Sequence, residues 1–206
     1  MTKVVLATRN PGKLAELRRI LAATGVSVAV TDLDDVPGMP EVAETGRTFT
    51  ENALLKARAV AAFTGLPAVA DDSGLCVDAL NGMPGVLSAR WSGSHGDDGA
   101  NLRLLLAQLA DVPAGERGAQ FVCVAALVLP AGGEHLAEGE VLGQLTRSPR
   151  GSNGFGYDPI FVPDGSGLTT AQMSADEKDK ISHRGKALRA LAPVIAGELG
   201  SQGRPG

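Results

Sequence analysis

Leu66-Pro-Ala-Val-Ala-Asp-Asp-Ser-Gly74 places two adjacent carboxylates directly after a short apolar run. Such a run predicts a buried strand, and in an open α/β sheet ligands bind at the carboxyl ends of the strands. Two buried, ionised carboxylates are costly unless a cation or a shared proton compensates them. The stretch therefore predicts a divalent metal or a titrating base at Asp71 and Asp72. An Asx-turn, in which Asp72 or Ser73 caps local backbone N–H groups, is the competing interpretation.

The length and composition indicate one α/β domain. A chain of 206 residues can bury a sizeable core, and a hydrophobic content of 44% with 20% charged residues is ordinary for a globular protein. Because only 3% of the residues are aromatic, Ala, Val and Leu must build most of the core. We expect a single two-lobed domain over residues 1–199 and a disordered tail at residues 200–206.

The net charge and the two cysteines indicate which partners and which cellular compartment to expect. A net charge of −4 argues against binding to nucleic acid or to a membrane surface. Cys76 and Cys123 lie in apolar runs without metal-ligand spacing, which predicts small buried hydrophobic residues in a reducing compartment. The chain starts with a strand-like segment rather than a secretory leader, and no segment is long and apolar enough to span a membrane. We therefore expect a cytoplasmic protein.

Hydrophobic periodicity predicts an alternation of strands and helices, which is typical of an α/β fold. The expected strands are residues 4–7, 26–30, 66–70, 120–129, 135–145 and 160–162. The expected helices follow the loop at residues 8–13 and cover residues 50–63, 101–109 and a C-terminal stretch that starts at residue 174 and continues past residue 195. Thr48 or Thr50 is the expected N-cap of the second helix, and residues 174–177 match a capping box.

The loop Thr8-Arg9-Asn10-Pro11-Gly12-Lys13 joins the first strand to the first helix. Unpaired N–H groups and the helix dipole favour a phosphate at such a junction, although the spacing is not that of a Walker A motif. An N-cap role for Asn10 with a solvated Lys13 is the competing interpretation.

The stretch Gly154-Phe155-Gly156-Tyr157-Asp158 combines features that suit a nucleotide base. Its glycines allow close approach of the backbone, its aromatic rings can stack on a base, and Asp158 can accept a hydrogen bond from a ring N–H. Core packing of Phe155 and Tyr157 is the alternative.

A second basic group contains Lys178, His183 and Arg184, which could donate to carbonyl oxygens of a ligand. A solvated helix face is the alternative interpretation. Together, the anion-binding loop, the carboxylates, the aromatic residues and these donors predict a nucleoside triphosphate as the ligand.

Six sequence blocks in this order resemble the inosine/xanthosine triphosphate pyrophosphatase family, over nearly the whole chain. The blocks are residues 8–13, 44–53, 70–74, 82–90, 154–159 and 182–185. The resemblance implies a mixed α/β fold, with a long central sheet flanked by helices and two lobes around a nucleotide-binding cleft. It also implies a homodimer.

The resemblance further implies roles for individual residues. Asp72 binds Mg²⁺, with Mn²⁺ as a substitute metal, and acts as the base on water. Glu44 is the second metal carboxylate, with Glu51 as the alternative. Because a metal ligand is a poor free base, Asp71 or a neighbouring water could instead accept the proton. The residues implied to bind substrate are Thr8, Arg9, Asn10, Pro11, Gly12, Lys13, Ser73, Phe155, Gly156, Tyr157, Asp158, Lys178, His183 and Arg184.

The implied reaction is hydrolysis of ITP, dITP and XTP to the nucleoside monophosphate and pyrophosphate, which cleanses the nucleotide pool of deaminated purines. His183 or Arg184 would donate a hydrogen bond to the 6-oxo group of the base, whereas the amino group of adenine would face them as a second donor. One alternative is a pyrophosphatase for modified pyrimidine nucleoside triphosphates. Another is a nucleotide-binding module without hydrolysis, which the two carboxylates disfavour because they repel phosphate unless a metal intervenes.

Overall fold

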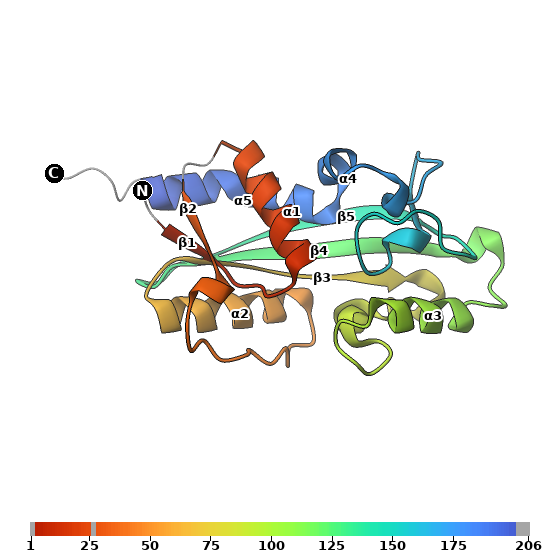
Figure 1. The fold of residues 1–206 in the computed structure, drawn as a ribbon, viewed down its shortest axis with the longest axis horizontal. Coiled ribbons are helices and arrows are strands. Elements are labelled where there is room, and N and C mark those ends of the chain that lie inside the picture. The colour runs from red at the N-terminus through yellow and green to blue at the C-terminus, as the bar shows by residue number, and fades with distance from the viewer. Residues whose placement is uncertain (1–2, 26–27, 201–206) are drawn as a thin grey trace. The chain divides into compact units, whose positions relative to one another are not determined.

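The computed structural model describes residues 3–25 and 28–200 (Figure 1). Its strands are β1 (Lys3–Leu6), β2 (Ala29–Asp32), β3 (Ala68–Val77), β4 (Gly118–Val128), β5 (Glu134–Leu145) and β6 (Phe161–Pro163). Its α-helices are α1 (Pro11–Ala23), α2 (Phe49–Thr64), α3 (Asp98–Gln108), α4 (Ala175–Ile181) and α5 (His183–Gly200). Within these described residues, no helix has the length and apolar character needed to cross a bilayer.

The strands of the described chain form one sheet in the order β2-β1-β3-β4-β5-β6. Strand β1 is parallel to both β2 and β3, whereas β6 is antiparallel to β5. The sheet is therefore mixed, and helices flank it. The prediction of a mixed α/β fold is confirmed.

The chain divides into two compact units. Unit 1 comprises Met1–Asp72, Cys123–Gly139 and Arg184–Gly206, and unit 2 comprises Ser73–Val122 and Glu140–His183. The expectation of one two-lobed domain over residues 1–199 stays a prediction. Of the expected tail, residues 201–206 lie outside the described part of the chain, as do residues 26 and 27 of the expected second strand.

In unit 1 the alternation of side chains along β1 separates two apolar clusters. Val4 and Leu6 pack with α1 and α5, whereas Val5 packs with α2. Figure 1 shows α1 and α5 on one side of β1 and α2 on the other. Cys123 is buried in the first cluster, as expected from the sequence, whereas Cys76 of unit 2 is half-buried.

Unit 2 has its own apolar cluster. Leu105 and Leu109 pack there with Phe121, Phe161 and other buried side chains. The rings of Phe121 and Phe161 meet edge to face with their centroids 4.7 Å apart, a favourable aromatic arrangement. A protein with few aromatic residues thus uses several of them in one core.

Strand β3 is longer than the sequence predicts. The expectation that the strand ends at Ala70 and that Asp71 follows it is wrong, because β3 continues to Val77. Leu75 and Val77 are fully buried in the unit 2 cluster, which favours continuation of the strand. Gly74 permits it, since a Cβ atom there would lie only 2.2 Å from the carbonyl oxygen of Gly85.

The C-terminal helical stretch is also different from the prediction. The capping box at Ser174 and Glu177 is confirmed, and it starts α4. One continuous helix is wrong, however, because Ser182 has an extended backbone (ψ 150°) that separates α4 from α5. The break places His183 and Arg184 at the start of a new helix.

Candidate active site

The loop before α1 has the geometry of a capped helix start. The side chain of Asn10 accepts a hydrogen bond from the backbone N–H of Lys13 at 3.1 Å, and Pro11 is the first helical residue. The backbone N–H of Asn10 donates to the hydroxyl of Thr8 at 3.2 Å. Because proline has no N–H and that of Lys13 is used, Gly12 offers the remaining N–H of the first turn to an anion.

One expectation about this loop is corrected. Lys13 is not a solvated side chain, because its ammonium lies 3.1 Å from Asp71 Oδ2. Arg9 donates from its guanidinium to the carbonyl oxygen of Met39 at 2.7 Å. The N-cap role of Asn10 is confirmed, and it engages the backbone N–H of Lys13 rather than the ammonium.

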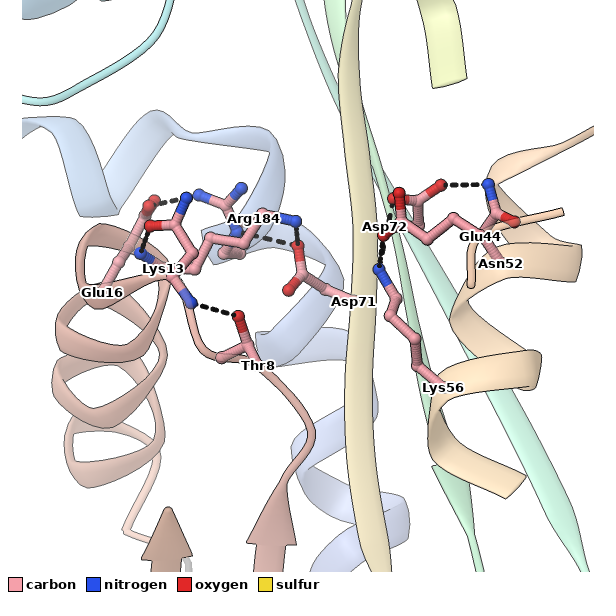
Figure 2. Close-up of polar contacts among 10 residues, drawn as sticks. Thr8, Lys13, Glu16, Glu44, Asn52, Lys56, Asp71, Asp72 and Arg184 are labelled. Carbon is pink, nitrogen blue, oxygen red and sulfur yellow. Dashed lines mark hydrogen bonds and ion pairs between the residues drawn. The ribbon is translucent and has the colours of Figure 1, made fainter. Parts of the chain in front are cut away.

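Asp71 and Asp72 point to opposite sides of β3 (Figure 2). Successive residues of a strand face opposite ways, so two adjacent carboxylates inside a strand cannot share one site. The prediction that they form a pair with one cation or one shared proton is therefore wrong. The Asx-turn interpretation is wrong as well, since both residues belong to a regular strand.

On the first side of β3, Asp71 lies in a network with equal numbers of positive and negative groups. Asp71 Oδ2 is 3.1 Å from Lys13 Nζ and 3.1 Å from Arg184 Nε. The guanidinium of Arg184 also contacts the carboxylate of Glu16. Burial opposes the charge on Arg184, but Glu16 and Asp71 outweigh it and raise the pKa of the guanidinium. Two cations and two carboxylates thus compensate one another here.

On the second side, Asp72 lies beside α2. Asp72 Oδ2 accepts from the side-chain amide of Asn52 at 3.1 Å, and Asp72 Oδ1 is 3.4 Å from Lys56 Nζ. The same ammonium is 2.7 Å from Glu44 Oε1. Asn52 and Lys56 are four residues apart, so they occupy one face of α2. Asn52 also accepts from the backbone N–H of Gly46 at 2.8 Å, which anchors the loop that carries Glu44.

Burial dominates the electrostatics of Asp72. It raises the pKa of the carboxyl, and the positive charges of Lys56 and Lys13 only partly oppose this shift. Burial also opposes the charge on Lys56, but Asp72, Asp71 and Glu44 outweigh it and raise the pKa of the ammonium. On the side of β3 that carries Asp72, the ammonium of Lys56 therefore contacts two carboxylates, those of Asp72 and Glu44.

The donor set on this side fits a hard cation. Glu44 and Asp72 supply oxygen ligands, and they already converge on one positive group. Mg²⁺ is commonly held by one or two carboxylates together with waters and substrate phosphates. Among the described residues, no group of three or more His, Cys, Asp or Glu side chains has metal-binding geometry. Waters and the substrate would therefore have to supply the other ligands of such an ion.

Glu51 has a different role from Glu44. Its carboxylate accepts from the backbone N–H groups of Arg47 at 2.5 Å and Thr48 at 3.1 Å, and Thr48 in turn caps the N–H of Glu51. This capping box starts α2. The geometry therefore favours Glu44 over Glu51 as the partner of Asp72.

Unit 2 brings Phe155, Asp158 and Lys178 together. Asp158 Oδ2 is 2.6 Å from Lys178 Nζ and accepts from the backbone N–H of Phe155 at 2.9 Å. Asp158 Oδ1 accepts from the hydroxyl of Thr170 at 2.8 Å. Lys178 Nζ lies 5.0 Å from the centroid of the Phe155 ring, a cation–π distance. Asp158 is 2% exposed, so its carboxylate organises this group from within.

Steric and conformational constraints explain the glycines at positions 154 and 156. Gly154 has φ of +74°, and a Cβ atom there would lie 2.1 Å from Asp158 Oδ2. Gly156 has φ of +62° and donates its N–H to Asp98 Oδ2 at 2.7 Å. Both positions therefore need glycine for the loop geometry itself.

Other predicted ligand residues are buried. Tyr157 packs in the core and its hydroxyl donates to the carbonyl oxygen of Ser88 at 2.9 Å, so a stacking role for this ring is wrong and core packing is right. The ring of His183 stacks on Phe121 with centroids 4.8 Å apart. Lys178, His183 and Arg184 are all buried, which corrects the solvated-face interpretation. Ser73 is half-buried at the position of β3 after Asp72.

Three polar residues of these groups were not among the predicted site residues. Asn52 and Lys56 contact Asp72, and Glu16 contacts Arg184. A signal was present for each: Asn52 and Lys56 have helical i,i+4 spacing in an Ala-rich helix, and Glu16 follows Lys13 by three residues in α1. Without the tertiary contacts, these residues look like ordinary helix-surface polar groups.

The chain is thus a mixed α/β protein in which Glu44 and Asp72 contact one ammonium beside β3. The chain belongs to the Ham1 family, whose model matches residues 4–194. The resemblance that the sequence blocks indicated is thereby confirmed.

Named relatives are similar over almost their full lengths. A Nocardia farcinica protein named dITP/XTP pyrophosphatase is 62% identical over 197 residues, which cover 95% of this chain and 96% of that protein. A Streptomyces avermitilis protein with the same name is 60% identical over 200 residues, 97% of this chain and 100% of that protein.

Solved structures are similar as well. The crystal structure of nucleoside-triphosphatase / dITP/XTP pyrophosphatase from Mycobacterium abscessus has 58% identity and a TM-score of 0.75, and the match covers 93% of this chain and 100% of that chain. A HAM1 protein from Coxiella burnetii has 41% identity and a TM-score of 0.85, with coverage of 96% and 100%.

Proposed function

We propose that this chain hydrolyses dITP and XTP, together with ITP, to the nucleoside monophosphate and pyrophosphate in a Mg²⁺-dependent reaction. That the chain is an enzyme, a hydrolase of nucleoside triphosphates, is confirmed by the relatives named dITP/XTP pyrophosphatase. The observation that carries the finer proposal is the pair of carboxylates, Glu44 and Asp72, that converge on one cationic position.

Glu44 and Asp72 would hold the Mg²⁺ ion. When bound, the ion supplies Lewis-acid stabilisation of the charge that develops on the triphosphate. Neighbouring side chains orient the two carboxylates. Asn52 fixes the orientation of the Asp72 carboxylate through its amide, and Lys56 joins Asp72 to Glu44. The positive charge of Lys56 opposes in part the rise in the pKa of Asp72 that burial causes.

Asp72 is suited to receive a proton from the attacking water. Its carboxylate lies at the proposed metal position, so the proton would pass to it directly or through a neighbouring water. The water would attack the α-phosphorus in line with the departing pyrophosphate. Asp71 lies on the other side of β3, so we assign it a positioning role toward Lys13 rather than proton transfer.

The loop before α1 is proposed to bind phosphate oxygens. Thr8 offers a hydroxyl, Gly12 an N–H at a helix N-terminus, and Lys13 an ammonium. Asp71 holds that ammonium at 3.1 Å, and Arg184 and Glu16 complete the network behind it. A pre-positioned ammonium loses less conformational entropy when a phosphate binds.

Base recognition is proposed for Phe155 and Lys178. A 6-oxo purine presents an acceptor to an ammonium donor, whereas adenine presents an amino group that would leave the donor unpaired. Asp158 and the Phe155 ring hold the ammonium of Lys178 in place. Direct base contacts by Arg184 are not proposed, because its guanidinium is engaged by Asp71 and Glu16. A homodimer in the cytoplasm is likewise a proposal.

The test is pyrophosphate release from ITP, dITP, XTP, GTP, ATP and a panel of modified pyrimidine triphosphates at matched concentration, with Mg²⁺ and with EDTA. We expect metal-dependent release from ITP, dITP and XTP well above that from ATP and GTP. Preferred turnover of a pyrimidine, or equal turnover of ATP and ITP, would contradict the proposed substrate. Binding of ITP without any release would contradict hydrolysis.

A further inference from the structure

Unit 2 contains a groove of about 420 Å³ that none of the groups above uses. It lies beside the ends of β5 and β6, and three arginines line it: Arg117, Arg147 and Arg150. Asp164 is the one acidic residue of its lining. The volume is that of an ordinary small-molecule site. We call it the arginine groove.

Arg117 is held rigidly in this groove. It is 2% exposed, and its guanidinium donates to three backbone carbonyl oxygens: those of Leu145 at 2.9 Å, Leu109 at 2.6 Å and Thr146 at 3.0 Å. Carbonyl oxygens satisfy N–H groups and orient the guanidinium, but they carry no net charge. The positive charge of Arg117 is thus fixed in position and left uncompensated by these bonds.

Arg147 adds a second positive charge beside the first. Its guanidinium donates to the carbonyl oxygens of Ala110 at 3.1 Å and Val112 at 3.0 Å. Burial, and then the charge of Arg147, lower the pKa of Arg117. Within the described residues, Arg117, Arg147 and Arg150 take part in no ion pair. The C-terminal end of α3 carries the partial negative charge of a helix dipole, which offsets only part of the positive charge of Arg117 and Arg147.

Arg150 has an anchored backbone and an available side chain. Its N–H donates to the carbonyl oxygen of Pro159 at 2.8 Å, and its carbonyl accepts from the hydroxyl of Thr169 at 2.7 Å. Its side chain is exposed, and across residues 3–25 and 28–200 it makes no hydrogen bond or ion pair. The Arg150 guanidinium is thus carried by an anchored backbone and lines the groove together with Arg117 and Arg147. It can donate hydrogen bonds to an anion there.

We propose that the arginine groove binds a phosphate-type oxyanion, either inorganic or as the phosphate group of a nucleotide. The planar fork of arginine matches the geometry of phosphate oxygens, and a doubly charged anion would compensate the positive charges that the protein leaves uncompensated. The residues of this site are separate from those proposed for hydrolysis. The proposal therefore holds or fails independently of the reaction.

The experiment titrates inorganic pyrophosphate into a Lys13→Ala variant by calorimetry, without divalent metal. This background weakens the phosphate site proposed at the loop before α1. We expect one pyrophosphate per chain, at least tenfold weaker binding in Arg150→Gln, and an intermediate loss in Arg150→Lys. Arg103→Gln is the matched control, because Arg103 is an exposed arginine of α3 in the same unit and does not line the groove. It should bind within twofold of the background.

A second titration with inosine monophosphate distinguishes a free phosphate from a nucleotide as the ligand. Equal affinity for pyrophosphate and inosine monophosphate identifies the phosphate group as the ligand, and tighter binding of the monophosphate identifies a nucleotide. Absence of binding to a folded Lys13→Ala chain would overturn the proposal, as would equal affinities of Arg150→Gln and Arg103→Gln. If Lys13→Ala does not fold, Arg150→Gln alone must remove one of two pyrophosphates that bind to the otherwise unchanged chain.

Discussion

Asp71 and Asp72 are neighbours in sequence with the same side chain, yet the two sides of β3 give them different surroundings. Asp71 lies among two cations, Lys13 and Arg184, and a second carboxylate, Glu16, so that charge is balanced. Asp72 shares the ammonium of Lys56 with Glu44, so that two carboxylates converge on one cationic position. Figure 2 shows the two groups separated by the strand.

This difference suggests that the Asp71 group stabilises the fold and the Asp72 group serves the reaction. A buried network of ion pairs fixes the positions of its members. Two carboxylates that converge on one position favour a divalent cation there. We therefore expect changes at Asp72 to affect turnover most strongly, and changes at Asp71 to affect stability most strongly.

The largest effect is expected from Asp72→Asn, which removes a proposed metal ligand and base while keeping the hydrogen bond to Asn52 feasible. We expect pyrophosphate release from ITP to fall at least about a hundredfold, the lower end for loss of a general base. The measurement is the rate at saturating ITP and Mg²⁺, with circular dichroism as a check of folding. A rate within threefold of the unchanged chain would contradict the role of Asp72.

Asp71→Asn tests the other side of β3. It removes one of the two carboxylates that contact the buried Arg184, and removal of one partner from a buried ion pair costs about 3 kcal/mol of unfolding free energy. Urea denaturation followed by fluorescence or circular dichroism measures this loss. Asp72→Asn is the control and should cost less, because Lys56 keeps Glu44 as a partner. Equal losses would show that the two sides do not differ as described.

Glu44→Gln and Glu51→Gln form a matched pair of carboxylate substitutions. Glu44→Gln should raise the Mg²⁺ concentration for half-maximal rate about tenfold or more, because it removes an anionic ligand. Glu51→Gln should leave that concentration unchanged and lower the unfolding free energy by about 1 kcal/mol through the weakened capping box. A Mg²⁺ titration of the rate decides between them. A larger shift in Glu51→Gln would reverse the assignment.

The smallest effect concerns pH. Burial raises the pKa of Asp72 in the folded protein, so the folded state binds this proton more tightly than the unfolded state. The stability of the unchanged chain relative to Asp72→Asn should therefore fall as the pH rises from the ordinary aspartate range through the raised pKa. The rate should rise over the same range as the base ionises. Urea midpoints and rates between pH 4 and 7 test both, and a stability difference that grows with pH would contradict the shift.

Local features were predictable because they depend on residues a few positions apart. The N-cap at Asn10, the N-cap at Thr48 and the capping box at Ser174 all appear as expected. Capping joins a side chain to a backbone group within one helical turn, so the sequence contains the whole interaction. The choice of Lys13, Asp72 and Glu44 as polar residues of interest rested on such local patterns and on the family resemblance.

The contacts that distinguish the two sides of β3 were not predictable in this way. Arg184 meets Glu16 and Asp71 across 168 and 113 residues of sequence, and Lys56 meets Asp72 across 16. Such pairs form only when the sheet and the helices have assembled. The buried positions of Tyr157 and His183 depend on the same assembly.

By itself, the sequence determined the α/β class, the capped helix starts and the family, because each depends on local periodicity or on motifs read in order. The tertiary structure alone decided that Asp71 and Asp72 lie in separate groups, that Lys56 joins Asp72 to Glu44, and that Ser182 divides the last helical stretch. The physical reason is that continuation of β3 through both carboxylates depends on burial of Leu75 and Val77, and a strand of period two then turns adjacent side chains apart.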